Sequence, residues 1–489
     1  MPDVQPFALI IALIATAIFL AALSSRVSAW IRVPAPAIFL LAAAVASDVF
    51  PVLGSLPIRS DQRIVTVALI FILFDGGMHI GWSRFRSAAA GVVWLGVAGT
   101  VVTAAALAAA AHGLFHFGWR NSLLIGTALA PTDPAVVFSV LGRREISGRS
   151  GTLLEGESGA NDPVGIAMML SLLGARGGGV GDVASAFGQF ALQMVVGSAI
   201  GVAGAHGLLV AMRRIPLPNE ALYPVRTLAG GALIYSVATL CHGSGFLAVF
   251  LAGILVGDER APYKHEIERF ASAVSSLSEI VAFTVLGLTI SLGGVLKDGQ
   301  LLTGLLLSVM LILFVRPVLV GLLLIRVRLS VGERVFVLWS GLKGAVPILL
   351  GTFVLSASVV QGSAIYDIVF VVVTVSVVVQ GGLVPVLARA LKVPMTVVEP
   401  EPWALGMRFR DEPEGLRRYL VAARSPADGC SVADLPVGES GWVSMVRRNG
   451  QLVQVRGGTE LRAGDEVLLL ADREAELDRL FGQAATERP

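Results

Sequence analysis

Charged residues and cysteines are both scarce in this sequence. Asp, Glu, Lys and Arg make up 15% of its 489 residues, whereas hydrophobic residues make up 55%, and the mean hydropathy is +0.78. This composition excludes an ordinary soluble protein and indicates a polytopic protein embedded in a lipid bilayer. The formal net charge of +2 gives no support to nucleic acid as a partner.

The two cysteines, Cys241 and Cys430, are too few for a disulfide framework or a zinc site. No nucleophile-and-base arrangement stands out, so we expect neither an enzyme nor a bound cofactor in the membrane part. The first apolar run, 7–23, follows Asp3 rather than a basic region and lacks a clear cleavage site. We interpret it as a membrane span and not as a removed signal peptide.

Apolar stretches recur along residues 1–394 and predict an all-α transmembrane domain. Each stretch is long enough to cross about 30 Å of hydrocarbon, or to do so together with a neighbour. We count thirteen, of which the eighth and ninth are short. They lie near 6–24, 29–48, 62–80, 88–112, 120–141, 152–174, 184–212, 224–241, 244–257, 268–292, 300–326, 332–355 and 364–391.

The basic residues between these stretches predict the orientation. With thirteen spans, one set of loops carries sixteen basic residues and the other carries five. By the positive-inside rule the richer set is cytoplasmic, the N-terminus is outside and the C-terminus is inside. The richer set is Arg26, Arg32, Arg84, Arg86, Arg143, Arg144, Arg149, Arg213, Arg214, Arg226, Arg260, Lys264, Arg269, Arg326, Arg328 and Arg334, and the other is Arg59, Arg63, Arg120, Arg176 and Lys297.

The composition changes after Lys392. Residues 395–414 are rich in Pro and charge without a periodic apolar pattern, which is typical of a linker. Residues 415–489 contain short alternating runs, an Asn449-Gly450 hairpin signal and a final helical pattern. We therefore predict a small α+β domain on the cytoplasmic side.

The segment EGESGANDP, residues 155–163, places carboxylates where lipid-compatible sequence is expected. An ionised group near the bilayer centre costs roughly 2.5 to 3.5 kcal/mol, so such residues face a protein interior or a water-filled path. Asp162 is the leading candidate, because a carboxylate binds either a proton or a small hard cation. The alternatives are that it caps a helix broken before Pro163 or pairs permanently with a buried base.

Two apolar stretches are interrupted at mid-span. The fifth contains Pro131 and Pro134, and the twelfth contains Gly341, Gly344 and Pro347. The interruptions are seven stretches apart, so the two helices run in opposite directions, as expected for inverted repeats. Paired interruptions of this kind indicate the binding site of a transporter.

Four residues near the interruptions are candidates for the site. Asp133 can balance an exposed positive helix end and Lys343 a negative one. Thr132 can contribute a hydroxyl or main-chain oxygen, although Thr132 and Asp133 could be helix caps only. Ser158 lies four residues before Asp162 on the same helical face and is a candidate ligand.

Asn161, beside Asp162, is interpreted as a positioning residue rather than a direct ligand. Glu157 points to another face and needs a base, and the equally isolated Arg316 in the eleventh stretch can provide one. Asp75 could line an access funnel or could be a helix-end residue beside Gly76.

His79 and His242 fall at span ends and are not assigned a role. Glu155 is interpreted as a charge at the start of its helix.

Four motifs together resemble a known family: TDPAVV (132–137), ESGANDPVGIA (157–167), the arginine at position 316, and GLKGAVPI (341–348). The chain resembles monovalent cation/proton antiporters of the NhaP and sodium/proton exchanger type. Within that group it is most similar to the bacterial cell-volume-regulation, potassium/proton antiporter branch. The similarity covers about residues 5–392.

This resemblance implies a homodimer in the bacterial cytoplasmic membrane that works by alternating access, with a dimerisation domain and a mobile core. It implies that Asp162 binds the proton and the cation, that Ser158 and Thr132 are ligands, and that Glu157 and Arg316 form a stabilising pair. The uncharged Asn161 beside Asp162 resembles the residue pair of the electroneutral branch of the family. This resemblance implies one cation exchanged per proton.

The family commonly has arginine where this chain has Lys343, which keeps the charge but loses bidentate contacts.

Residues 415–485 resemble a TrkA-C domain through CSVADLPV and TELRAGDEVLLLAD. A regulatory nucleotide and a purely structural role both stay open for this domain, because no Gly-rich dinucleotide motif precedes it.

The functional prediction is a secondary antiporter that exchanges K+ or Na+ for protons. A regulated cation channel and a sodium-coupled solute symporter are the alternatives. Interrupted helices with a titratable carboxylate favour the antiporter, and no filter-like TVGYG loop is present. Residue types alone do not distinguish K+ from Na+.

Overall fold

The chain forms two compact units, Met1–Pro400 and Glu401–Pro489. The computed structural model describes residues 34–50, 52–54, 57–141, 144–146, 149–175, 180–259, 261, 263–297, 299–325, 327, 329–397, 416–436, 442–448, 451–453, 455–470 and 474–481. The first predicted span, the start of the second and most of the predicted linker lie outside these residues. The predictions that depend on them, including the position of the N-terminus, stay predictions.

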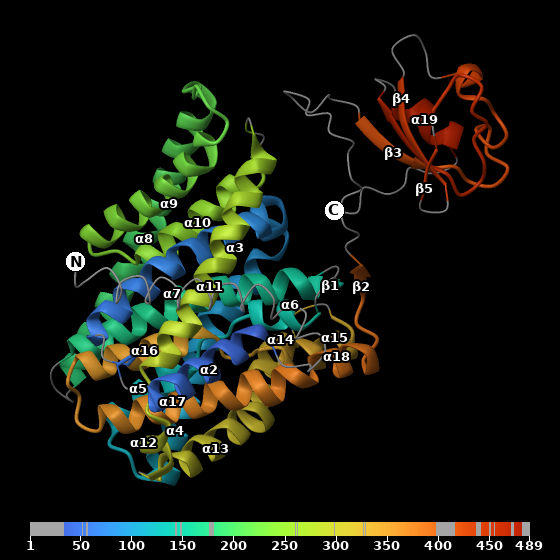
Figure 1. Cartoon of the computed structure of the whole chain (residues 1–489). Coiled ribbons are helices and arrows are strands. Elements are labelled where there is room, and N and C mark those ends of the chain that lie inside the picture. Colours follow the sequence, from blue (N-terminus) through green and yellow to red (C-terminus); the bar gives the residue numbers. More distant parts are fainter. Residues whose placement is uncertain are drawn as a thin grey trace, which may run out of the picture. The chain divides into compact units, whose positions relative to one another are not determined.

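The first unit is predominantly helical (Figure 1). Its helices up to the middle of the chain are α2 (Ala35–Val49), α3 (Ile58–Val93), η1 (Trp94–Gly99), α4 (Thr100–Phe115), α5 (Trp119–Leu129), α6 (Ala135–Leu141), α7 (Arg149–Gly174), α8 (Val180–Arg214), α9 (Leu222–Leu240) and α10 (Gly245–Gly257). The later ones are α11 (Lys264–Leu288), α12 (Leu292–Lys297), α13 (Gln300–Met310), η2 (Leu311–Val320), α14 (Gly321–Leu324), α15 (Val331–Trp339), α16 (Ala345–Ser356), α17 (Gly362–Val375), η3 (Ser376–Gln380) and α18 (Gly381–Ala390).

The third and fourth predicted spans are separated by a break at Gly81 rather than by a loop over 81–87. The chain is helical from Ile58 to Phe115, and the interruption is a kink at Gly81, which has φ 65° and ψ 165°. Glycine adopts this non-helical backbone conformation without the steric cost that a side chain would bring, so one helix ends and the next begins at Gly81 with no loop between them. The short eighth and ninth stretches are separate helices, α9 and α10.

Five helices in the described part of the chain are long and apolar enough to span a membrane, and three shorter apolar helices accompany them. Pairs of short helices that meet inside the unit replace single long ones, as α5 and α6 do. The predicted total of thirteen spans and the inverted repeats therefore stay predictions.

A small sheet corrects the start of the predicted linker. Strand β2 (Met395–Val397) pairs in antiparallel fashion with β1 (Arg144–Ile146). β1 lies between α6 and α7, far away in sequence. The first residues after the last transmembrane helix are therefore held by backbone pairing, which no local pattern in residues 395–397 reveals.

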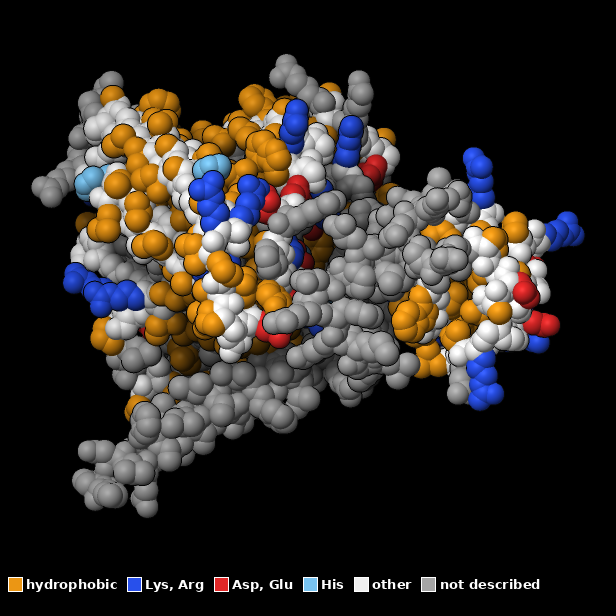
Figure 2. All heavy atoms as spheres, turned by 90° about the horizontal axis from the view of Figure 1, so that it is seen from above, with side chains coloured by type: hydrophobic (Ala, Val, Ile, Leu, Met, Phe, Trp, Pro, Cys, Tyr) orange, Lys and Arg blue, Asp and Glu red, His pale blue; other side chains and the backbone are white. Residues whose placement is uncertain are grey.

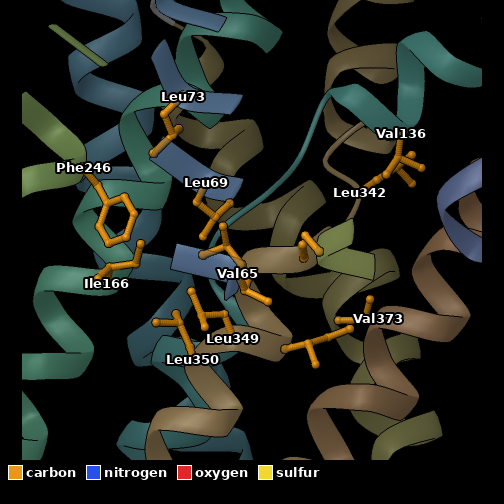
Figure 3. Close-up of a cluster of buried hydrophobic side chains, with 14 of the residues drawn as sticks. Val65, Leu69, Leu73, Val136, Ile166, Phe246, Leu342, Leu349, Leu350 and Val373 are labelled. Atoms are coloured by element: carbon orange, nitrogen blue, oxygen red, sulfur yellow. The ribbon is translucent and has the colours of Figure 1, made fainter. Parts of the chain in front are cut away.

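The helices pack in two groups. α10 packs against α3, α8 and α9, and α11 packs against α2 and α3, whereas α17 packs against α5, α13 and α16. Figure 3 shows how the groups meet: Leu69 of α3, Ile166 of α7, Phe246 of α10 and Leu350 of α16 belong to one buried cluster. Burial of such side chains away from lipid and water fixes the helices that carry the polar residues described below.

Large apolar side chains also cover much of the outside of this unit. On the face in Figure 2, hydrophobic side chains spread over most of the described surface and basic ones stand in small groups. Phe187 is 71% exposed and Leu240 is 80% exposed. Exposed apolar area on this scale fits contact with lipid tails rather than water.

The second unit contains a four-stranded antiparallel sheet in the order β3-β6-β4-β5. Its strands are β3 (Leu416–Leu420), β4 (Trp442–Arg448), β5 (Gln451–Val453) and β6 (Glu466–Leu470), and α19 (Glu474–Phe481) follows them. Arg448 pairs with Gln451, so two residues connect β4 to β5 at the predicted hairpin position. Tyr419 stacks on Phe481 in a separate buried core, with ring centroids 4.9 Å apart.

Candidate functional site

The two interrupted helices meet inside the first unit. α5 ends at Leu129 and α6 begins at Ala135, while α15 ends at Trp339 and α16 begins at Ala345. The backbone N–H of Asp133 donates to the carbonyl oxygen of Leu342 at 2.8 Å, so the two connecting segments run against each other. Figure 3 places Val136 and Leu342 side by side at this point. We call the segments 130–134 and 340–344 the crossing.

Lys343 is buried in the crossing and faces the end of α5. It is 1% exposed, and its Nζ donates to the carbonyl oxygens of Ala130 and Pro131, both at 2.9 Å. These carbonyls follow the last turn of a helix, where the macrodipole is negative. The ammonium group therefore satisfies two backbone acceptors and compensates the partial negative charge of that helix end.

Asp133 lies beside the start of α16. A side-chain carbon built on Gly344, the residue just before α16, would overlap the Asp133 carboxyl group. Only glycine leaves room for the carboxylate there, next to backbone N–H groups that have no partner within the helix. Asp133 therefore compensates the positive end of α16, as Lys343 compensates the negative end of α5.

Asp162 lies in α7 next to the crossing. It is 7% exposed, and its Oδ1 atom is enclosed without a hydrogen-bond partner in the described part of the chain. Asp133 and Lys343 are the charged groups that act on it. The carboxylate therefore lies in the electric field of the charges of the crossing, and one of its oxygens is available to bind an ion.

The helix that carries Asp162 is not broken at Pro163, since α7 runs from Arg149 to Gly174 through the proline. Pro163 has no N–H, so the carbonyl of Gly159 lacks its usual donor four residues later. This geometry does not support the alternative in which Asp162 caps a broken helix.

Ser158, Asn161 and Thr132 form a buried hydrogen-bond network beside Asp162. Asn161 Nδ2 donates to Thr132 Oγ1 at 2.7 Å, and Asn161 Oδ1 accepts from the Thr132 N–H at 3.3 Å. Ser158 Oγ donates to the Thr132 carbonyl oxygen at 2.5 Å. Asn161 thus bonds to Thr132 through both of its polar atoms, and the hydroxyl groups of Ser158 and Thr132 both belong to this network.

Glu157 and Arg316 form a buried ion pair, with Oε1 and Nη2 3.0 Å apart. Arg316 also donates from Nε to the carbonyl oxygen of Leu338 at 2.9 Å, at the end of α15. The pair thereby links α7 and η2 to α15, the helix that leads into the crossing. Its position off the Asp162 face of α7 fits a structural role.

Asp75 lies apart from the crossing, on α3. It is 8% exposed and accepts a hydrogen bond from Ser272 Oγ at 3.2 Å. His79 Nδ1 is 3.4 Å from the same carboxylate oxygen. His242 lies in the turn between α9 and α10 with φ 59°.

One carboxylate of the membrane part was missed from the sequence. Glu279 lies in α11, and its Oε1 is enclosed without a hydrogen-bond partner in the described residues. The signal was available, because Glu279 is an isolated acid inside the tenth apolar stretch.

No group of three or more His, Cys, Asp and Glu side chains in the described ranges is arranged to hold a metal ion. The oxygens at and beside the crossing come instead from the carboxylates of Asp133 and Asp162, from hydroxyl groups and from the backbone. Such a set suits a weakly held monovalent cation better than a tightly bound transition metal.

Comparison with known proteins decides the family. Residues 14–390 match the family described as sodium/hydrogen exchanger, transmembrane, and residues 416–482 match the TrkA-C domain. The chain belongs to the sodium/hydrogen exchanger family. The resemblance seen in the four sequence motifs is thereby confirmed, and the matched region of this exchanger contains the whole crossing.

Several curated relatives are similar over most of this exchanger. The K(+)/H(+) antiporter NhaP of Alkalimonas amylolytica is 33% identical over 455 residues, which cover 92% of this chain and 78% of the relative. The K(+)/H(+) antiporter NhaP2 of Shewanella sp. strain MR-4 is 31% identical and covers 99% and 84%. The Na(+)/H(+) antiporter NhaP of Pseudomonas aeruginosa is 24% identical and covers 68% and 81%.

The fold of this exchanger is similar to that of a solved antiporter structure. The sodium proton antiporter MjNhaP1 from Methanocaldococcus jannaschii at pH 8 matches with a TM-score of 0.64 and 22% identity. The match covers 77% of this chain and 99% of that structure. The helical unit therefore has an NhaP-like fold.

Proposed function

We propose that this protein is a secondary antiporter that exchanges a monovalent cation for a proton across the membrane. The observation that carries the proposal is the buried Asp162, whose Oδ1 has no hydrogen-bond partner in the described residues, at the crossing of two interrupted helices. Membership of the sodium/hydrogen exchanger family supports it.

The coupling arises from competition at one carboxylate. Ionised Asp162 attracts a hard cation, with oxygens of Ser158 and Thr132 as further ligands, while Asp133 and Asn161 support the geometry. Once Asp162 is protonated it loses its charge and with it the attraction for the cation. Each conformational change therefore carries one of the two ions, and their opposite fluxes are linked.

We propose K+ as the transported cation. The relatives that are similar over more than nine-tenths of the chain are named potassium/proton antiporters, whereas the relative named a sodium/proton antiporter is similar over a shorter part. The choice depends on cavity size and the number of oxygens around the ion.

We further propose one cation exchanged per proton. Position 161, next to the working carboxylate, holds an asparagine whose two polar atoms are both bonded to Thr132. It contributes no second negative charge to the cycle. Exchange is then electroneutral, and membrane voltage does not drive it.

Alternating access requires that the two helix groups move against each other. Gln62 of α3 donates to the Thr352 carbonyl oxygen at 2.8 Å and to Ser356 Oγ at 2.7 Å, both near the end of α16. These bonds hold the groups together at one end in this conformation, and the transport cycle breaks them. We also propose that the membrane part has thirteen spans in two inverted repeats. The protein is then a homodimer in the bacterial cytoplasmic membrane, with its N-terminus outside.

The TrkA-C domain is proposed to regulate transport from the cytoplasm. Its family is known for a regulatory role, and it has a hydrophobic core of its own in the second unit. A nucleotide is the ligand class to test first. Equilibrium dialysis of the full-length protein with radiolabelled mononucleotides and cyclic dinucleotides tests this part separately from transport.

The deciding experiment is cation-driven proton movement in proteoliposomes, with K+ and Na+ in turn. We expect exchange by the wild type and a loss of about 100-fold or more in Asp162→Asn, because the amide holds neither a proton nor the cation charge. Asp48→Asn, at an exposed helix end, is the matched control and keeps full activity.

Persistent exchange in Asp162→Asn would contradict the mechanism. Cation current without a proton gradient would indicate a channel. A requirement for an organic substrate would indicate a symporter.

A further inference from the structure

Glu279 is a membrane-embedded carboxylate that the exchange mechanism above does not use. Its Oε1 atom is enclosed, has no hydrogen-bond partner in the described residues, and is acted on by Asp133 of the crossing. α11, which carries Glu279, packs against α16, the helix that begins beside Asp133. An acid at membrane depth without a fixed partner is costly, which points to a function.

Ser272, Ser275 and Glu279 lie on one face of α11. They are separated by three and four residues, the spacing that brings side chains to about 5 to 6 Å from each other on a helix. None of the three is an apolar residue, although the helix around them is rich in Val, Leu, Ile and Phe. Together they form a polar line along α11, and α11 packs against α16, the helix that follows the crossing.

The other end of this line reaches the surface through α3. Ser272 Oγ donates to Asp75 Oδ1 at 3.2 Å, and His79 Nδ1 lies 3.4 Å from the same oxygen. The His79 side chain is 57% exposed, whereas the Asp75 side chain is 11% exposed. Proton donors and acceptors therefore follow one another from an exposed imidazole to the enclosed carboxylate oxygen of Glu279 on α11.

We propose that the line His79, Asp75, Ser272, Ser275 and Glu279 conducts protons between the surface and the crossing, and that Glu279 is its inner relay residue. The inference rests on the proposed cation/proton exchange. At each hop one O–H or N–H bond breaks as another forms, and a carboxylate that accepts a proton on one side releases one on the other. No net charge stays on the line, so it passes the proton that Asp162 exchanges without changing the ratio of the two ions.

The helices that pack against α11 supply the ionisable groups around this face. The ionisable side chains on the helices that pack against α11 are Asp48 of α2; Arg59, Asp61, Arg63, Asp75, His79, Arg84 and Arg86 of α3; and Tyr223, Arg226 and Tyr235 of α9. α16 carries none in Ala345–Ser356. Glu155 of α7 also acts on His79 and places a second carboxylate at the surface end of the line.

The test compares Glu279→Gln and Glu279→Asp with the wild type in proteoliposomes, with K+-driven proton flux measured from pH 6 to 9. Gln keeps the shape but transfers no proton, so we expect the maximal rate to fall about 100-fold, with the half-saturating K+ concentration within about 2-fold of the wild type. Asp keeps the carboxyl group, and we expect it to restore most of the rate and the wild-type pH profile.

Glu268→Gln is the matched control. Glu268 lies four residues before Ser272 on the same face of α11 but pairs with Lys264 at 3.3 Å near the start of the helix, outside the line. We expect its rate to stay within about 2-fold of the wild type. Asp75→Asn interrupts the line at another place and is expected to reproduce the loss seen with Glu279→Gln, which protects the test against misfolding of a single variant.

Wild-type rate and pH profile in both Glu279→Gln and Asp75→Asn would overturn the inference and leave cation/proton exchange intact. A large rise in the half-saturating K+ concentration would instead make Glu279 a cation ligand and would also overturn it. A change in the number of charges moved per cycle would show a second coupled proton, against a relay. Absence of exchange in the wild type would refute the proposed function itself.

Discussion

The Nζ atom of Lys343 donates a hydrogen bond to the carbonyl oxygen of Pro131 at 2.9 Å, across the point where two interrupted helices meet. Together with the bond to Ala130, it places one ammonium group at the C-terminal end of α5, where the backbone carbonyls have no partner within the helix. The same crossing holds Asp133 at the start of α16. Opposite charges thus stabilise opposite helix ends, and the carboxylate of Asp162 on α7 lies beside them.

Replacing Lys343 should destabilise the transmembrane unit. In Lys343→Met the carbonyls of Ala130 and Pro131 lose their donor, and each unsatisfied buried acceptor costs about 1 to 3 kcal/mol. We expect a lower midpoint of thermal unfolding in detergent, measured by fluorescence-detected size exclusion. The exposed Lys392 is the control, and Lys392→Met should leave the midpoint unchanged. An equal midpoint for the two variants would show that the helix end needs no cation.

The Glu157–Arg316 pair should be strongly coupled. Removing one partner leaves a buried charge alone, so Glu157→Gln and Arg316→Gln are each expected to cost about 3 to 5 kcal/mol. The double variant should be more stable than the sum of the two single losses predicts, because no charge is left unpaired. A double-mutant cycle of thermal stability measures this coupling. Simple additivity of the two losses would show that the two side chains do not stabilise each other.

The close approach of α7 to α10 should be needed for transport. A side-chain carbon on Gly159 would overlap the ring of Phe250, and Gly159 is in the same turn as Asp162. Gly159→Ala is expected to reduce exchange in proteoliposomes about 10-fold by displacing α7, and Phe250→Leu in the same chain should recover part of it. Gly113→Ala, on an exposed face of α4 with open space around it, serves as the control. Full activity of Gly159→Ala would show that transport does not depend on the close approach of α7 to α10.

Asp465 should make the C-terminal domain sensitive to acid. Burial alone would raise the pKa of this carboxyl group, but the hydrogen bonds from Arg448 and from the Arg462 N–H hold its pKa below the usual value. A depressed pKa in the folded state stabilises the domain above the unfolded value of about 3.9, and this stabilisation is lost as pH falls through the folded value.

Asp465→Asn removes that contribution. At pH 7 we expect the variant to lose about 1 to 3 kcal/mol relative to the wild type, the value of a hydrogen bond to a charged group. The difference in unfolding midpoint, followed by tryptophan fluorescence of the full chain, should shrink between pH 5 and pH 3. A difference that does not depend on pH would show that the carboxylate charge contributes nothing.

Part of this architecture was predictable because its causes are local. Prolines at 131 and 134 and the glycines at 341 and 344 interrupt helices wherever they stand, since they remove a donor or relax the backbone. Two interruptions in long apolar stretches therefore predicted the crossing.

Other features depended on distant contacts. The pairing of residues 395–397 with β1 was not predicted, because it depends on a segment far away in sequence. Glu279 was visible as an acid in an apolar stretch, but its enclosure depends on how α11 packs against other helices. The continuity of α7 through Pro163 was undecided, because packing around a proline determines whether a helix breaks or bends there.

The sequence by itself determined that this protein is a multi-span membrane protein, where its helices are interrupted and which carboxylate lies among them. Those properties follow from hydropathy, from the backbone chemistry of proline and glycine, and from the cost of a charge in lipid. Only the tertiary structure decided which groups satisfy one another: Lys343 with the carbonyls of α5, Asn161 with Thr132, and Ser272 with Asp75. Hydrogen bonds act over about 3 Å, and the helix packing that brings such groups together is a property of the whole fold.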